Sequence, residues 1–332
     1  MTHSSQVSNS SSVLVKAFLQ ATRPRTFPLA IASIVCGSSL GLSQLVTYDS
    51  IGWHNWLVLI LTFWVALALQ ILSNLANDYG DGVKGTDDLR DASSPQRMLA
   101  GGQLQPEQFK KIIIGWAALT FFSGVLLIAL GFDNLSDFLL FLAFGIIAIL
   151  AAMAYTMGKR PYGYRAMGEV AVLLFFGWLA VLGSAYLQTQ QFNIAHLIVA
   201  TGCGGLAACV LFVNNMRDIY SDKQAGKITL AVLLGDSRMQ SAYGLLFMAS
   251  YLCYLLYAIN FNWYTLSVLL VYPLAYKHIH TIHRIRLKNL SDNNQTMRVD
   301  TVLIGKQLKA IVMITLIINL LFALGMIMSH LI

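Results

Sequence analysis

Residues 55–81 read NWLVLILTFWVALALQILSNLANDYGD. No charged residue occurs before Asp78 in this stretch, and nearly every residue up to Leu75 is apolar. A helix needs about 20 mostly apolar residues to cross the hydrocarbon core of a bilayer. Residues 55–75 are therefore predicted to form a membrane-spanning helix, which ends in a cluster of polar and acidic side chains.

The composition of the whole chain agrees with that prediction. Of its 332 residues, 57% are hydrophobic and only 11% are charged, whereas soluble domains carry roughly 25% charged residues. The four cysteines stand in apolar runs without metal-binding spacing, which indicates small buried side chains and not a disulfide or zinc framework. The sequence predicts an all-α membrane protein.

Nine apolar stretches are candidate spans. They cover roughly residues 28–47, 55–75, 110–131, 135–156, 167–187, 193–216, 241–260, 262–277 and 310–331. With a cytoplasmic N-terminus, all 22 Lys and Arg residues fall in cytoplasmic segments or at cytoplasmic helix ends. Because short basic loops stay in the cytoplasm, this distribution favours nine spans in that direction.

The remaining segments are assigned more briefly. Residues 1–20 are Ser-rich at the start and have no signal-peptide pattern, so we predict a disordered cytoplasmic tail before one domain at 21–332. The basic stretch 277–286 could hold a metal or nucleic acid, but a loop resting on anionic lipid headgroups is the favoured interpretation. The net charge of +7 is likewise attributed to orientation in the membrane and not to nucleic-acid binding.

Two polar clusters of similar design stand about 140 residues apart, each at the cytoplasmic end of a predicted span. Their spacings, i/i+4/i+7 and i/i+4/i+8, place each trio on one face of a helix. The trios are Asn74, Asp78 and Asp81 in the first cluster and Asn214, Asp218 and Asp222 in the second.

Two facing carboxylate clusters would repel each other unless a cation lay between them. Mg²⁺ prefers oxygen ligands, uses one or two carboxylates, and completes its shell with water and substrate phosphates. The four aspartates are therefore predicted to bind Mg²⁺ and a diphosphate, and to be the catalytic residues. An isolated aspartate at the membrane surface usually caps a helix or pairs with a base, but two matched clusters on one face favour a site.

Amide and basic side chains near the clusters are the candidates for holding the substrate. Asparagines can add neutral ligands, and Lys or Arg can stabilise the departing diphosphate. The candidates are Asn74, Asn77, Lys84, Arg97, Asn214, Asn215, Arg217 and Lys227.

These motifs resemble the UbiA superfamily of intramembrane aromatic prenyltransferases, and most closely its branch that acts on 1,4-dihydroxy-2-naphthoate. The similarity extends from about residue 20 to the last predicted span. It is carried by residues 23–30, 74–85, 155–169 and 214–235. One departure is Ser94, where that branch usually has a glycine before Pro95.

The resemblance implies nine helices around a central cavity and Mg²⁺-dependent transfer of a polyprenyl group from polyprenyl diphosphate. The implied acceptor is 1,4-dihydroxy-2-naphthoate, which loses its carboxylate and enters menaquinone synthesis. Tyr155, Lys159 and Arg160 could orient this acid, although plain membrane anchoring of the two bases is an equal alternative. Glu169 is either a base or an interhelical hydrogen-bond partner.

Other functions remain as alternatives. The acceptor could be 4-hydroxybenzoate (the ubiquinone route), homogentisate or a porphyrin, although the spacing of Asp78 and Asp81 favours naphthoate. A cation-coupled transporter would carry its acids near the bilayer midplane. Here the acids stand at one face among basic loops, which argues against transport.

Overall fold

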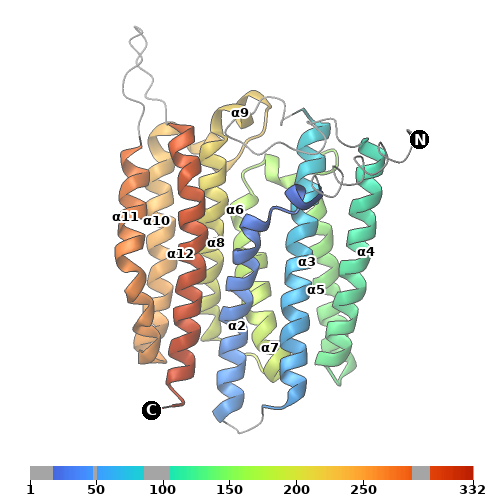
Figure 1. Cartoon of the computed structure of the whole chain (residues 1–332), viewed down its shortest axis with the longest axis vertical. Helices are drawn as coiled ribbons and strands as arrows, with labels where there is room; N and C mark the ends of the chain where they lie inside the picture. Colours follow the sequence, from blue (N-terminus) through green and yellow to red (C-terminus); the bar gives the residue numbers. More distant parts are fainter. Residues whose placement is uncertain (1–17, 48–50, 86–104, 286–299, 332) are drawn as a thin grey trace, which may run out of the picture.

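The structure is a computed structural model that describes residues 18–47, 51–85, 105–285 and 300–331, nearly all of them helical. Within these ranges, eight helices are long and apolar enough to cross a membrane. They stand roughly parallel in one bundle (Figure 1). The elements are η1 (Pro24–Thr26), α2 (Phe27–Thr47), α3 (Trp53–Val83), α4 (Pro106–Gly131), α5 (Leu135–Ala154), η3 (Tyr162–Tyr164), α6 (Gly168–Val172), η4 (Leu173–Leu182), α7 (Gly183–Thr189), α8 (His196–Arg217), α9 (Ile219–Gln224), α10 (Leu230–Asn260), η5 (Trp263–Val271), α11 (Tyr272–Arg284) and α12 (Thr301–Met328).

The eight helices account for every predicted span except the eighth, at 262–277. There the chain forms η5 and then α11, which pack against α10 and α12 and lie alongside them in Figure 1. The all-helical membrane fold is confirmed, whereas the count of nine spans and the direction of the N-terminus stay predictions.

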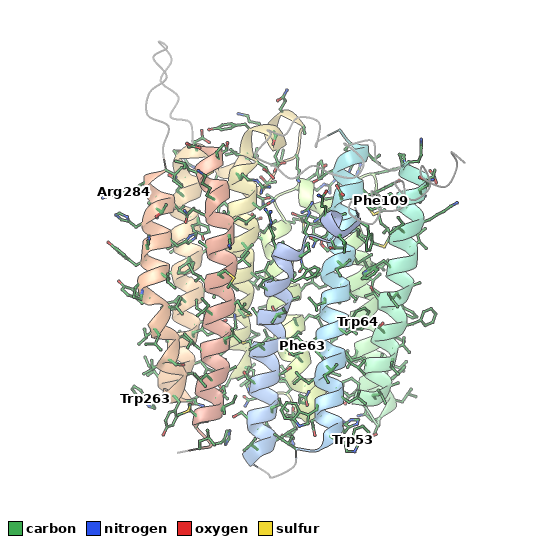
Figure 2. All side chains as sticks on the ribbon, viewed as in Figure 1. Trp53, Phe63, Trp64, Phe109, Trp263 and Arg284 are labelled. Atoms are coloured by element: carbon green, nitrogen blue, oxygen red, sulfur yellow. The ribbon has the colours of Figure 1, made fainter. Side chains whose placement is uncertain are left out.

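The outer surface of the bundle is apolar, as expected for a chain surrounded by lipid. Large side chains such as Ile60, Phe122 and Leu245 are more than half exposed. Trp53 and Trp263 lie at one end of the bundle, and Phe109 and Arg284 lie toward the other (Figure 2). Tryptophans at the end of a bundle are typical of the membrane–water interface.

Helix α8 is the centre of the packing, since it contacts α2, η4, α10 and α12. A close approach makes this possible: a Cβ atom on Gly204 would lie 2.5 Å from the carbonyl oxygen of Leu173, and one on Gly177 would lie 2.4 Å from that of Ala200. Small residues let helix backbones meet in this way in membranes, where lipid supplies no hydrophobic driving force between helices.

Two boundaries differ from the predictions. Residues 18–20, assigned above to a disordered tail, are helical, and the Phe18 ring packs beside Trp116. The segment 278–284, assigned to a loop on lipid headgroups, belongs to α11. Its buried residues Ala275, His278 and Ile282 follow a helical spacing, so one face of α11 packs into the bundle.

His278 holds α11 to its neighbours through a buried hydrogen-bond chain. The Tyr243 hydroxyl of α10 lies 2.6 Å from His278 Nε2, and His278 Nδ1 lies 3.0 Å from Gln307 Oε1 of α12. Inside a membrane bundle such polar links between helices contribute about 0.6–2 kcal/mol each.

We expect Tyr243→Phe to lower the melting temperature of the purified protein without loss of activity. The variant leaves His278 Nε2 buried without this partner, which costs about 1–2 kcal/mol. Thermal unfolding in detergent measures the effect. Tyr276→Phe is the matched control, because Tyr276 is 59% exposed on α11; equal melting temperatures for the two variants would contradict the role given to His278.

Candidate active site

The first polar cluster lies on an unbroken helix, as predicted. Helix α3 continues to Val83, so Asn74, Asp78 and Asp81 occupy its last turns. Asp78 is 1% exposed and Asp81 is 2% exposed. Buried carboxylates at a helix end need counter-charges or hydrogen-bond donors, since an isolated buried charge is very costly.

The second cluster does not lie on one helix, contrary to the prediction. Helix α8 ends at Arg217, and Asp218 has φ −95° and ψ 11°, outside helical geometry. The short helix α9 then carries Asp222. The break turns the chain over the end of the bundle (Figure 1), and Asp218 and Asp222 are nonetheless both buried.

Lys227 links the two clusters. Its ammonium Nζ lies 3.4 Å from Asp81 Oδ2 and 3.7 Å from Asp222 Oδ1. The Lys227 side chain is 6% exposed, so its charge is largely removed from water. A cation does lie between the carboxylates, as the repulsion argument requires, but in this structure it is a side chain of the protein.

The loop 155–166 fixes Lys227 in place by backbone pairing. Ala166 N donates to Ile228 O at 2.7 Å, and Ile228 N donates to Tyr164 O at 3.3 Å. The Tyr164 hydroxyl donates to Asp81 Oδ1 at 2.9 Å. The Tyr164 ring lies under two ammonium groups, with Lys84 Nζ 4.4 Å and Lys227 Nζ 5.3 Å from its centroid.

Tyr164 is a site residue that the motif spacing missed. It stands inside a segment quoted above for its resemblance to the family, but nothing in its own position predicts contact with Asp81 across the fold. Tyr155, Lys159 and Arg160 of this loop were expected to orient the acceptor, and Tyr164 shows that the loop also contacts the first acidic cluster.

We expect Tyr164→Phe to lower kcat/KM about ten- to a hundredfold, because hydrogen bonds to charged groups contribute about 1.5–3 kcal/mol. The phenylalanine keeps the ring under the two ammonium groups, so Tyr164→Leu should lower kcat/KM further. Steady-state kinetics of the three proteins measure both effects. Full activity in Tyr164→Leu would remove Tyr164 from the site.

Arg217 supplies a positive charge to the second cluster through its ion pair with Asp218. Its Nε and one terminal nitrogen each donate to an Asp218 carboxylate oxygen at 2.7 Å, and that nitrogen also donates to Asn214 Oδ1 at 2.8 Å. The Asn215 amide donates instead to Glu169 Oε1 at 2.8 Å. Glu169 is therefore an interhelical hydrogen-bond partner, one of the two alternatives.

Arg23 is a second residue that was not among the predicted site residues. It has a left-handed backbone, with φ 49° and ψ 66°, immediately before η1. Asn74 holds this turn, since its amide donates to Thr22 O at 2.8 Å and to Thr26 Oγ1 at 3.0 Å. Asn74 thus positions the chain around Arg23 and also lines the cavity described next.

A cavity of about 340 Å³ extends from the acidic clusters into the bundle between α2, α3, α4, α5, α8 and the fifth span. Its walls are polar near the clusters and mostly apolar elsewhere. Of the four aspartates, Asp81 lines it directly. The other polar lining residues at that end include Arg23, Thr26, Asn74, Asn77, Tyr155, Tyr162, Asn214, Asn215 and Lys227.

Several of the other predicted substrate residues do not line this cavity. Lys84 donates to Thr156 O at 2.7 Å and does not line the cavity. Lys159 and Arg160 are exposed and also lie outside its lining, which agrees with the membrane-anchoring alternative. Arg97 lies outside the described residues.

Burial shifts the pKa of two groups near the clusters. The pKa of Tyr162 rises to about 12 because burial disfavours the phenolate, so the hydroxyl stays protonated at neutral pH and donates to Ala151 O. Partial burial lowers the pKa of Lys84, and the nearby Asp81 carboxylate opposes that shift.

The aspartate carboxylates fit a metal ion whose remaining ligands come from a substrate. Within the described ranges, no three His, Cys, Asp or Glu side chains gather closely enough to form a metal site of their own. Four buried carboxylates nevertheless face one end of the bundle, two of them joined through Lys227. This matches the preference of Mg²⁺ for one or two carboxylates together with phosphate oxygens.

Three comparisons with known proteins bear on this site. The model of the UbiA prenyltransferase family matches residues 37–304. The chain is 39% identical to 1,4-dihydroxy-2-naphthoate octaprenyltransferase of Escherichia coli K12, over 95% of this chain and 96% of that protein. It is 38% identical to the protein of that name from Haemophilus influenzae, over 95% and 97% of the two chains.

The fold also has a solved counterpart. The structure of a UbiA homologue from Archaeoglobus fulgidus, bound to DMAPP and Mg²⁺, superposes with a TM-score of 0.60 at 16% identity. The match covers 92% of this chain and 99% of that one. At this identity the likeness establishes a shared fold.

Proposed function

The chain belongs to the UbiA prenyltransferase family and is a membrane-embedded prenyltransferase, and from that premise we propose that it transfers a polyprenyl group to 1,4-dihydroxy-2-naphthoate. The choice of acceptor is supported by the 39% identity, over almost the whole of both chains, to a relative named 1,4-dihydroxy-2-naphthoate octaprenyltransferase. The product would be the decarboxylated prenyl naphthoquinol of menaquinone synthesis.

The donor diphosphate would bind at the acidic clusters. Asp78, Asp81, Asp218 and Asp222 are the residues that would hold Mg²⁺, and bound Mg²⁺ would draw charge onto the leaving diphosphate. Around them, Lys227 and the amides of Asn77 and Asn214 line the cavity. These groups would bind and orient the phosphate oxygens through charge and hydrogen bonds.

The apolar part of the cavity suits the prenyl chain. Its lining includes Leu69, Phe141, Phe175 and Leu187, which offer no hydrogen bonds to water. The allylic carbon becomes positive as the diphosphate leaves, and water would capture it. An apolar wall excludes water, and aromatic faces stabilise positive charge.

The acceptor would enter beside Arg23 and Tyr155, which line the polar end of the cavity. A guanidinium can hold an aromatic carboxylate by paired hydrogen bonds. An electron-rich ring carbon then bonds to C1 of the prenyl group while the C1–O bond breaks. The ring becomes aromatic again as its carboxyl group leaves as CO₂, so the electrons balance without any oxidant.

The basic residues near the site support a proposal for its location in the cell. Lys84, Arg217 and Lys227 stand at the same end of the bundle as the acidic clusters, and basic short segments remain in the cytoplasm. We therefore propose that the site opens toward the cytoplasm from the inner membrane.

A panel of acceptors tests the proposed function. The purified chain is incubated with octaprenyl diphosphate and Mg²⁺, and with 1,4-dihydroxy-2-naphthoate, 4-hydroxybenzoate or homogentisate. We expect prenylation of the naphthoate, at a kcat/KM at least about a hundredfold above that of the others, and loss of product with EDTA. Preferred turnover of 4-hydroxybenzoate would assign the chain to another branch, and no turnover of any acceptor would overturn the proposal.

A further inference from the structure

Lys227 occupies a special place between the two acidic clusters. Its ammonium lies within 3.7 Å of carboxylate oxygens from both clusters, and it lines the cavity in which the substrates are proposed to bind. These carboxylates, Asp81 and Asp222, are also proposed ligands of Mg²⁺. The protein cation and the metal would therefore share the same two carboxylate groups.

The position of the ammonium is built into the fold. Lys227 N donates to Asp222 O at 2.8 Å, and the preceding Gly226 has φ +69°, a left-handed conformation that glycine adopts easily. The next residue, Ile228, is paired with the loop 155–166 through Tyr164. Three neighbouring backbone constraints thus hold the side chain at the carboxylates, unlike a lysine on a mobile surface.

Charge balance makes this arrangement stable without metal. A buried pair of carboxylates is strongly disfavoured unless a cation compensates it, and removal of one partner from a buried ion pair is costly. Lys227 compensates Asp81 and Asp222, and Arg217 compensates Asp218 through two hydrogen bonds. Lys227 and Arg217 together thus form ion pairs with three of the four aspartates.

We propose that Lys227 excludes free divalent cations from the site and admits the metal together with a diphosphate. A free Mg²⁺ must displace the ammonium and then lie beside it, so two cations repel each other at low dielectric. A diphosphate that accompanies the metal brings its own negative charges, and the ammonium turns from the carboxylates to them. This inference rests on the proposed function and adds an order of binding to it.

Direct metal binding tests the inference. Equilibrium dialysis measures the binding of labelled Mn²⁺ to the purified full-length chain in detergent, with no diphosphate present. The variants are Lys227→Met, which removes the charge, and Lys227→Arg, which keeps it. Lys223→Met is the matched control, because Lys223 is an exposed lysine of α9. It removes the same charge nearby without touching the carboxylates.

We expect Lys227→Met to bind Mn²⁺ about tenfold or more tightly than the wild-type chain. Lys223→Met should stay within about threefold of wild type, since exposed charges are screened. Lys227→Arg should also stay within about threefold, because it keeps the positive charge beside the carboxylates. In the wild-type chain, inorganic diphosphate should raise protein-bound Mn²⁺ at a fixed free Mn²⁺ concentration, and in Lys227→Met this increase should shrink.

Two results would overturn the inference. One is a Lys227→Met chain that binds Mn²⁺ no more tightly than Lys223→Met. The other, which remains decisive if Lys227→Met does not fold, is a wild-type chain that binds Mn²⁺ equally well with and without diphosphate. The acceptor panel separates this from the proposed function: turnover with an unchanged Mn²⁺ affinity rejects the gating role alone, whereas tighter Mn²⁺ binding without turnover rejects the reaction alone.

Discussion

Asp81→Asn is expected to lower the rate of prenyl transfer by about a hundredfold to a thousandfold, the range seen when one preorganised electrostatic group is lost. Asp81 lines the cavity, accepts from the Tyr164 hydroxyl and lies 3.4 Å from Lys227 Nζ. The asparagine keeps the size of the side chain but removes the charge that is proposed to bind metal and that balances Lys227.

The loss should appear both in turnover and in binding. Titration of a radiolabelled prenyl diphosphate in the presence of Mg²⁺ should show weaker binding to Asp81→Asn. Asp133→Asn is the control, because Asp133 is an exposed residue in the turn between α4 and α5, at the other end of the bundle. An Asp81→Asn chain with more than half of the wild-type rate would show that the first cluster is not the catalytic site.

Gly80→Ala is expected to reduce activity at least about tenfold and to destabilise the protein by about 1–3 kcal/mol, as overpacking in a close-packed site does. A Cβ atom at Gly80 would lie 2.5 Å from Thr156 Oγ1 and 2.7 Å from the backbone carbon of Thr156. Because backbone cannot rotate away, α3 and the loop 155–166 must separate.

That separation would reach the site directly. Gly80 stands between Asp78 and Asp81, and the Thr156 hydroxyl donates to Ala76 O at 2.8 Å. The same loop delivers Tyr164 to Asp81. The activity and the melting temperature of Gly80→Ala should therefore both be lower than those of the wild-type chain.

The same substitution elsewhere in the bundle provides the control. A Cβ atom at Gly115, in α4, would meet nothing within 4 Å. Alanine is favoured over glycine inside a helix by about 0.5–1 kcal/mol, so Gly115→Ala should be neutral or stabilising. Wild-type activity and stability in Gly80→Ala would mean that α3 and the loop do not meet as described.

The apolar stretches and the first cluster could be predicted from the sequence because they depend on local periodicity. The stretch 55–81 forms a helix with Asp78 and Asp81 near its end. A long apolar segment in a membrane must be helical, because its backbone N–H and C=O groups find no water and must bond to one another. The distribution of lysine and arginine gave the expected direction, which stays a prediction.

The second cluster shows where local periodicity fails. The spacing of its polar residues is helical from Asn214 to Asp222, yet helix α8 ends just before Asp218. No glycine or proline marks this break. It follows from tertiary packing, since both Asp218 and Asp222 are buried against other elements and their charges pair with Arg217 and Lys227. A sequence pattern has no information on such distant contacts.

Long-range contacts also explain the site residues that sequence reasoning missed or misplaced. Tyr164 reaches Asp81 across 83 positions of sequence, and Lys227 reaches it across 146. The argument from repulsion required a cation between the clusters and predicted a metal, but it did not predict that Lys227 lies beside Asp81 and Asp222. The metal stays a prediction. Similarly, the stretch from Lys277 to Arg284 looked like a surface loop because its charged residues hide the helical spacing of the buried ones.

One measurement tests the central claim most directly. The purified chain, with Mg²⁺ and octaprenyl diphosphate, is given 1,4-dihydroxy-2-naphthoate labelled with ¹⁴C in its carboxyl group, and both the released CO₂ and the mass of the product are recorded. The account predicts one labelled CO₂ for each prenyl naphthoquinol formed, and neither in EDTA. Consumption of the diphosphate without an aromatic product, or a prenylated product that retains the label, would contradict it.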